Sequence, residues 1–106
     1  MTTIAVLTTV DSKESADTIA AALVRRKLAA CVQVSAIDSI YIWDGEVQES
    51  PEFRLLAKTT DERYAEVEAA IRELHTYDLP AIVGFPLPHA FAPYADWVAE
   101  NSDGKP

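Results

Sequence analysis

The segment 28–45 constrains the fold more than any other part of the chain, because it joins an alternating strand pattern to a tight-turn signal. Asp44-Gly45 suits the positive φ angles of a two-residue turn, so the alternating residues around it predict a β-hairpin over residues 40–48. A hairpin is antiparallel, and two strands alone are marginally stable in water. The chain must therefore supply further strands or helices to cover it.

The first strand of this hairpin is apolar on both faces, since Ile40 and Ile42 alternate with Tyr41 and Trp43. One layer of helices covers one face of a sheet, and uncovered aromatic side chains at a sheet edge mark an interface. We therefore expect a homo-oligomer in which these four residues pack on a neighbouring subunit. The alternative is that a C-terminal helix carrying Trp97 folds back over the hairpin.

The first third of the chain reads as strand, helix, strand. The β-branched run over residues 2–10 predicts a buried strand. Ser12 supplies a helix cap, and the apolar stripe that includes Ile19 and Leu23 predicts a helix that closes on the basic residues 25–27. Residues 28–36 alternate as a strand does, which places Cys31 in the middle of that strand.

The remaining chain predicts two more strands and two more helices. Ser50-Pro51 separates the hairpin from a strand over residues 52–60, and Thr60 caps a second helix with an apolar stripe over residues 64–74. An irregular connection over residues 75–80 precedes a strand over 81–87. A C-terminal helix over residues 91–101 is expected to turn three side chains inward, namely Tyr94, Trp97 and Val98.

This order predicts an α+β fold, a ferredoxin-like βαββαβ sandwich with an extra β-hairpin extension and a C-terminal helix. At 106 residues the chain is expected to form one domain over residues 1–106. Residues 101–106 are expected to be a frayed tail.

The charge balance restricts the classes of partner. Asp and Glu number 17 against nine Lys and Arg, which gives a net charge of −8. Binding of phosphate backbones or of anionic membrane surfaces requires clustered cations, so we expect neither nucleic acid nor membrane as a partner. One cysteine permits no intramolecular disulfide and suits a reducing compartment, and we find no signal peptide or long apolar run. A cytoplasmic location is therefore expected.

The motifs of common enzymes are absent. Three scattered glycines cannot form a phosphate-binding loop, and no Cys-x-x-Cys, His-Glu-x-x-His or Gly-x-Ser-x-Gly motif occurs. Mid-strand apolar surroundings favour Cys31 as a packing residue over a nucleophile. One thiol and two imidazoles are too few for a closed zinc site in one chain, although an oligomer could combine copies and would then favour copper or zinc.

The connection 75–80 is the strongest candidate for a binding cleft, because it gathers an imidazole, a phenol and a carboxylate in four residues. Lys58, near the end of its strand, is expected to face the same cleft. These residues alone indicate an acidic, oligomeric, ferredoxin-like domain with a cleft for a cation or a small ligand.

Several motifs, in order and spacing, resemble the CutA family of divalent-cation tolerance proteins. They are Thr8-Thr9, Leu28-Ala29-Ala30-Cys31-Val32, Ser39-Ile40-Tyr41-Ile42-Trp43-Asp44-Gly45, Lys58-Thr59, His75-x-Tyr77-Asp78-x-Pro80 and Tyr94-x-x-Trp97. The resemblance covers residues 2–98 and implies a CutA-like homotrimer, similar in architecture to PII signalling proteins. It also implies binding of copper or another divalent metal, a role in metal tolerance and no established reaction.

The resemblance also implies roles for particular residues. Cys31 and His75 are the implied metal ligands. The implied cleft between subunits is formed by Trp43, Lys58, Tyr77 and Asp78, and the implied trimer interface by Ile40, Tyr41, Ile42 and Trp43. The residue after the loop proline is often Glu in the family and is Ala81 here.

Two hypotheses follow, and we expect neither to involve catalysis. The first is a trimeric, copper-binding or other divalent-metal-binding protein of metal tolerance. The second is a PII-like signalling or scaffold trimer that binds a small anionic ligand or a protein partner in the cleft, with Lys58 as the cation that an anion requires.

Overall fold

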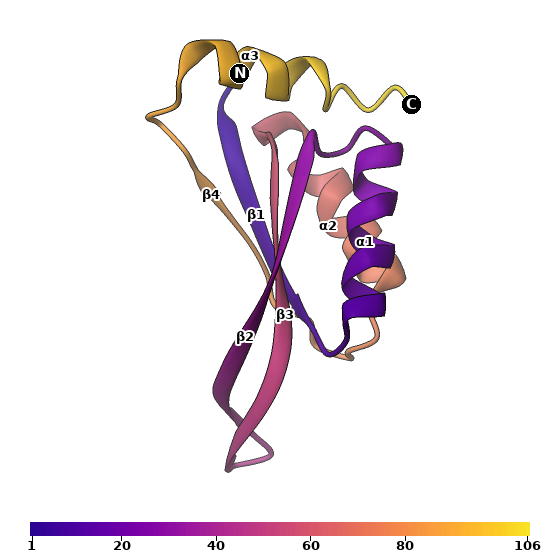
Figure 1. Cartoon of the computed structure of the whole chain (residues 1–106), viewed down its shortest axis with the longest axis vertical. Coiled ribbons are helices and arrows are strands. Elements are labelled where there is room, and N and C mark those ends of the chain that lie inside the picture. Colours follow the sequence, from indigo (N-terminus) through magenta and orange to yellow (C-terminus); the bar gives the residue numbers. More distant parts are fainter.

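The computed structural model describes residues 1–106 as a four-stranded sheet, three α-helices and one short 3₁₀ helix (Figure 1). This confirms the predicted α+β class. In chain order the elements are β1 (Thr3–Val10), α1 (Lys13–Arg25), β2 (Cys31–Trp43), β3 (Glu46–Thr60), η1 (Asp61–Arg63), α2 (Tyr64–Leu74), β4 (Ile82–Pro86) and α3 (Ala92–Glu100).

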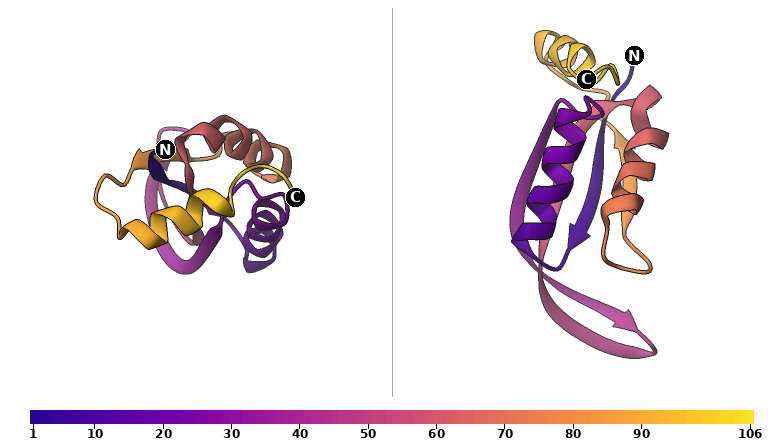
Figure 2. Two further views of the ribbon diagram at one scale, coloured as in Figure 1. Left: turned by 90° about the horizontal axis from the view of Figure 1, so that it is seen from above. Right: turned by 90° about the vertical axis from the view of Figure 1, so that its right-hand side faces the viewer.

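The sheet has the strand order β2-β3-β1-β4, and every neighbouring pair is antiparallel. Helices α1 and α2 lie side by side on one face (Figures 1 and 2). Ile19 and Leu23 of α1 and Ile71 of α2 are fully buried there against β1 and β3. At roughly 1.5–3 kcal/mol for each large apolar side chain, this burial is the main stabilisation of the two layers.

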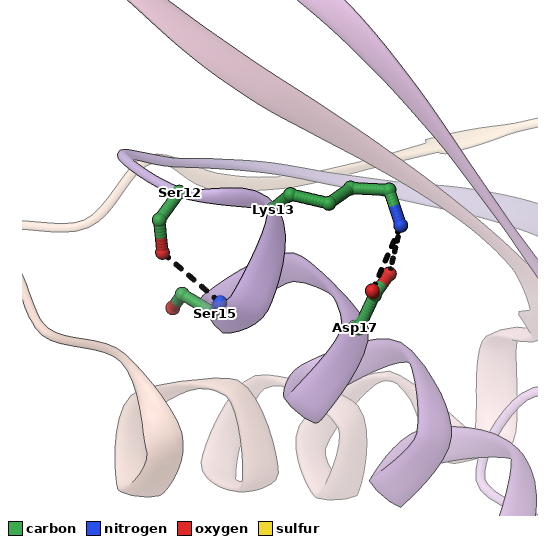
Figure 3. A network of polar contacts seen from close by, with 4 residues as sticks. All are labelled: Ser12, Lys13, Ser15 and Asp17. Atoms are coloured by element: carbon green, nitrogen blue, oxygen red, sulfur yellow. Dashed lines mark hydrogen bonds and ion pairs between the residues drawn. The ribbon is translucent and has the colours of Figure 1, made fainter.

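Helix α1 begins where its sequence predicts, because Ser12 caps it. The Ser12 backbone is extended, and its hydroxyl accepts a hydrogen bond from the Ser15 N–H at 3.1 Å (Figure 3). That bond satisfies one of the amides that a helix start leaves without a partner. Lys13 and Asp17 form an exposed ion pair one turn apart, which adds a few tenths of a kcal/mol at most.

The hairpin is longer than expected and is not a separate extension. Strand β2 runs unbroken from Cys31 to Trp43, and β3 continues through Pro51, which pairs with Asp38. Pro51 interrupts nothing because β1 pairs only with β3 residues 53–60, so at Pro51 strand β3 is already an edge strand. The predicted turn is confirmed, with φ of 52° at Asp44 and 77° at Gly45.

The C-terminal region corrects two expectations and rules out one alternative. Of the side chains expected to turn inward from α3, only Val98 is buried, while Tyr94 and Trp97 stack on each other and are 38% and 43% exposed. Helix α3 lies at the opposite end of the molecule from the hairpin turn, so it does not fold over the hairpin (Figures 1 and 2). Residues 101–106, expected to fray, are anchored: Ser102 is buried, and the Gly104 N–H donates to the Lys27 carbonyl at 2.9 Å.

Helix α2 also begins differently from the prediction. Thr60 makes no side-chain cap, and the 3₁₀ turn η1 leads the chain into α2. Thr60 is buried at the end of β3, opposite Thr3.

We expect Ser12→Ala to lower the free energy of unfolding by about 1 kcal/mol, because the Ser15 amide loses its acceptor at the helix start. Ser15→Ala is the matched control. It retains the backbone N–H and adds a better helix former, so we expect little or no loss. Guanidinium denaturation followed by circular dichroism, at equal chain concentrations, measures both. Equal losses in the two variants would contradict the capping role.

Candidate functional site

A cavity of about 670 Å³ lies where the distal half of the hairpin meets the connection between α2 and β4. Its lining includes three carboxylates, from Asp38, Glu52 and Asp78, and no Lys, Arg or His. Three aromatic side chains also line it, from Tyr41, Trp43 and Tyr77. The remaining lining residues are Thr9, Ser39, Ile40, Leu79 and Ala81.

A hydrogen bond joins Tyr77 and Glu52, which both line the cavity. The Tyr77 hydroxyl donates to Glu52 Oε2 at 2.7 Å, and Glu52 is only 7% exposed. Burial raises the pKa of Tyr77 well above its usual value of 10, and the hydrogen bond to Glu52 and the negative charges of Glu52 and Asp11 raise it further. Tyr77 is therefore a neutral hydrogen-bond donor throughout the physiological pH range.

His75 positions Tyr77 and does not line the cavity. It is the C-cap residue of α2. Its Nδ1 accepts from the Tyr77 N–H at 3.1 Å, so Nε2 carries the proton and donates to the Thr9 carbonyl at 2.8 Å. Both ring nitrogens are thus engaged within the chain. A metal ion could bind His75 only after one of these bonds had broken.

Lys58 and Cys31 lie toward the other end of the sheet, so the expectation that Lys58 faces the cleft is wrong for a single chain. Lys58 pairs with Cys31 across β2 and β3, donates to Gln33 Oε1 at 3.3 Å and lies 6.0 Å above the Tyr94 ring. Cys31 is partly buried and begins its strand, whereas its sequence predicted a mid-strand position.

The structure therefore does not bring the two implied metal ligands together within one chain. Cys31 pairs with Lys58, whereas Thr9, to which His75 is bonded, pairs with Arg54 four residues further along β3, a separation of roughly 13 Å along the strand. No group of three or more His, Cys, Asp or Glu side chains in the chain is arranged to hold a metal ion.

Trp43, Tyr77 and Asp78 line this cavity of one chain, and their implied place in a cleft between subunits stays a prediction. Glu52 and Asp38, in contrast, were missed. The position of the turn would have located both residues. Because Trp43 pairs with Glu46 next to the turn, the antiparallel register places Asp38 opposite Pro51 and Ile37 opposite Glu52. Treating Pro51 as a strand boundary concealed that register. Ala81, where Glu is frequent in the resembled family, lies on the cavity wall.

These features define an α+β protein with ferredoxin-like strand order and an acidic, aromatic cavity beside a long hairpin. A family model described as CutA1 divalent ion tolerance protein matches residues 4–101, and the chain belongs to this family. The predicted resemblance is thereby confirmed. The family is named for tolerance of divalent cations and not for a reaction.

Individual relatives are similar to this chain over nearly its whole length. The divalent-cation tolerance protein CutA of Thermus thermophilus is 46% identical over 98 residues, which cover 92% of this chain and 95% of the relative. A solved structure of the periplasmic divalent cation tolerance protein CutA from Archaeoglobus fulgidus superposes with a TM-score of 0.93 at 33% identity, covering 95% of this chain and 99% of that one. The solved structure of Cut A1 from Thermus thermophilus superposes with a TM-score of 0.91 at 44% identity, covering 94% of this chain and 98% of that one. None of the helices of this chain is long and apolar enough to span a membrane.

We expect Tyr77→Phe to lower the free energy of unfolding near pH 8 by about 1–3 kcal/mol, because the buried Glu52 loses its donor. Since folding raises the pKa of Tyr77, the wild type keeps this advantage below pH 10 and loses it as the pH rises further. The difference in free energy of unfolding between the wild type and Tyr77→Phe, measured by guanidinium denaturation, should therefore become smaller between pH 8 and pH 11. Tyr41→Phe should lower the free energy of unfolding less, because the Tyr41 hydroxyl makes only one hydrogen bond, an exposed one to Ser50. A difference in free energy of unfolding between the wild type and Tyr77→Phe that stays constant with pH would contradict this assignment.

Proposed function

We propose that the protein acts in divalent-cation tolerance as a homotrimer that binds copper or another divalent metal between its subunits. The observation that carries this proposal is the uncovered hairpin. Ile40, Ile42 and Val47 share one face of the distal β2–β3 ladder and are 70%, 66% and 67% exposed. An apolar patch of this kind on a two-stranded ladder is typical of an interface.

The open face of the sheet supports assembly as well. Leu7 pairs with Leu56 on one side and with Val83 on the other, and this apolar row faces away from α1 and α2. Phe85 on the same face is 40% exposed. A neighbouring subunit would bury both this row and the hairpin patch.

Assembly also supplies what one chain lacks for metal binding. Cys31 and His75 are distant within a chain, and a soft thiolate with an imidazole favours copper or zinc once symmetry brings copies together. The net charge of −8 further favours cations over anions. The proposal includes a cytoplasmic location, which the single unpaired cysteine supports; the similar Archaeoglobus structure is described as periplasmic.

The second hypothesis, a PII-like trimer that binds a small anion or a protein partner, has less support. An anion requires a cation at its site, and the cavity has three carboxylates and no basic side chain. Lys58, the residue that motivated the hypothesis, is bonded to Gln33 away from the cavity.

We expect light scattering coupled to gel filtration to return three times the chain mass of 11.6 kDa at micromolar concentration. Ile42→Asp should dissociate the assembly, because it places a charge in the apolar hairpin patch. Val24→Asp makes the same change on the exposed part of α1, outside the patch, and should leave the mass unchanged. A wild-type protein that elutes as a monomer would refute the trimer.

Titration calorimetry with Cu²⁺ tests the metal. We expect the wild type to bind, and Cys31→Ala with His75→Ala to reduce the affinity by at least about tenfold, since two donors are removed. His89→Ala, in an exposed connection, removes the other imidazole and serves as the control. Unchanged binding in the double variant would exclude Cys31 and His75 as ligands while leaving the trimer intact.

A further inference from the structure

We propose that residues 101–104 form a latch that holds α3 over Lys58 and Cys31, and that opening of this latch uncovers that end of the sheet. The latch lies at the opposite end of the molecule from the hairpin turn (Figures 1 and 2). It requires neither a bound metal nor a trimer. If the proposed metal site includes Cys31, the latch also controls access to that ligand.

Helix α3 is held only weakly by its own packing. Its nine residues are too few for a helix that is stable alone, and Val98 is its one fully buried side chain. Tyr94 and Trp97 stack on each other and stay partly exposed. Phe91, at the start of the helix, makes no side-chain cap and is largely exposed. The position of α3 therefore depends on contacts outside its own apolar face.

The first half of the latch closes the end of α3. The Asn101 side-chain amide donates to the Trp97 carbonyl at 2.9 Å, and the Ser102 hydroxyl donates to the Val98 carbonyl at 2.6 Å. Ser102 is buried together with Val98. These bonds satisfy carbonyls in the last turn of the helix, where partners are scarce.

Gly104 fastens the latch to the rest of the fold. Its N–H donates at 2.9 Å to the carbonyl of Lys27, which follows α1 with a left-handed φ of 54°. Gly104 has a φ of 73°, which glycine adopts without a steric penalty. The Arg63 guanidinium lies beside it. The latch thus connects α3 to the end of α1 and to η1.

The region under α3 contains Lys58 and Cys31. The Lys58 ammonium lies 6.0 Å from the centre of the Tyr94 ring, and cation–aromatic contacts at this distance are weak. Cys31 is the direct cross-strand partner of Lys58, which places the two side chains on the same face roughly 5 Å apart. Segments with few buried contacts open locally before the whole chain unfolds. Opening of α3 would therefore expose both side chains to solvent.

Native-state hydrogen exchange tests the latch on the intact protein. We expect α3 amides of the wild type to exchange through an opening that leaves β1 and α1 protected. Gly104→Ala disfavours the left-handed backbone, so exchange in α3 should accelerate at least about fivefold, with β1 and α1 unchanged. Gly45→Ala is the matched control, because it introduces the same strain at φ of 77° in the distant hairpin turn and should leave α3 unchanged.

Two results would overturn the latch. One is α3 exchange in the wild type that is as slow as in β1, which would mean that α3 opens only with global unfolding. The other is acceleration by Gly104→Ala that is absent from α3 or equal in α1 and β1. Should Gly104→Ala fail to fold, Ser102→Ala removes the bond to the Val98 carbonyl and should accelerate α3 exchange in the same selective way.

Alkylation of Cys31 by iodoacetamide tests whether α3 is a cover, because this is the only thiol of the chain. We expect the rate to rise in Gly104→Ala, or in Ser102→Ala where only that variant folds, by the same factor as the exchange of α3. Gly45→Ala should react at the wild-type rate. A thiol that reacts equally in all the proteins, or in none because another surface covers it, would overturn the role of α3 as a cover.

Discussion

The structure depends on a difference in length between strands. Strand β1 stops pairing with β3 at Val10↔Phe53, but β3 and β2 continue together to the turn at Asp44-Gly45. Beyond Phe53 the sheet has two strands, too few to be stable unassisted. Glu52 is the first β3 residue past the end of β1, and the connection after α2 meets it there through the Tyr77 hydroxyl. The same connection is fastened to the end of β1 by His75 and Thr9.

This junction separates the polar residues of the chain into two regions. Glu52, Tyr77 and the neighbouring carboxylates gather where the third strand ends, and they form an acidic cavity. Cys31 and Lys58 lie toward the opposite end of the sheet, near Tyr94 of α3. Residues that belong to one set of motifs in the sequence therefore lie on different surfaces of one chain. Assembly is what would bring those surfaces into relation, which is why the proposed metal site spans subunits.

Much of the fold was predictable because local signals and burial agreed. The cap at Ser12, the apolar stripes of α1 and α2 and the Asp44-Gly45 turn each rest on short-range chemistry. The errors arose where neighbours overrode local preference. Proline lacks the N–H that a neighbouring strand would require, so it interrupts a strand that is paired on both sides. At Pro51 strand β1 has already ended, and β3 continues as an edge strand. Trp97 was expected inside because it is large and apolar, but α3 buries Val98 instead.

The sequence by itself determined the order of the elements, the antiparallel hairpin and the resemblance to divalent-cation tolerance proteins, because each depends on residue types at fixed spacing. Only the tertiary structure decided which polar groups meet. Glu52 and Tyr77 are 25 residues apart and share a hydrogen bond, whereas His75 and Cys31 do not meet. The physical reason is register: the pairing of β2, β3 and β1 fixes the position of every side chain along the sheet, and the sequence specifies that register only through the complete set of contacts.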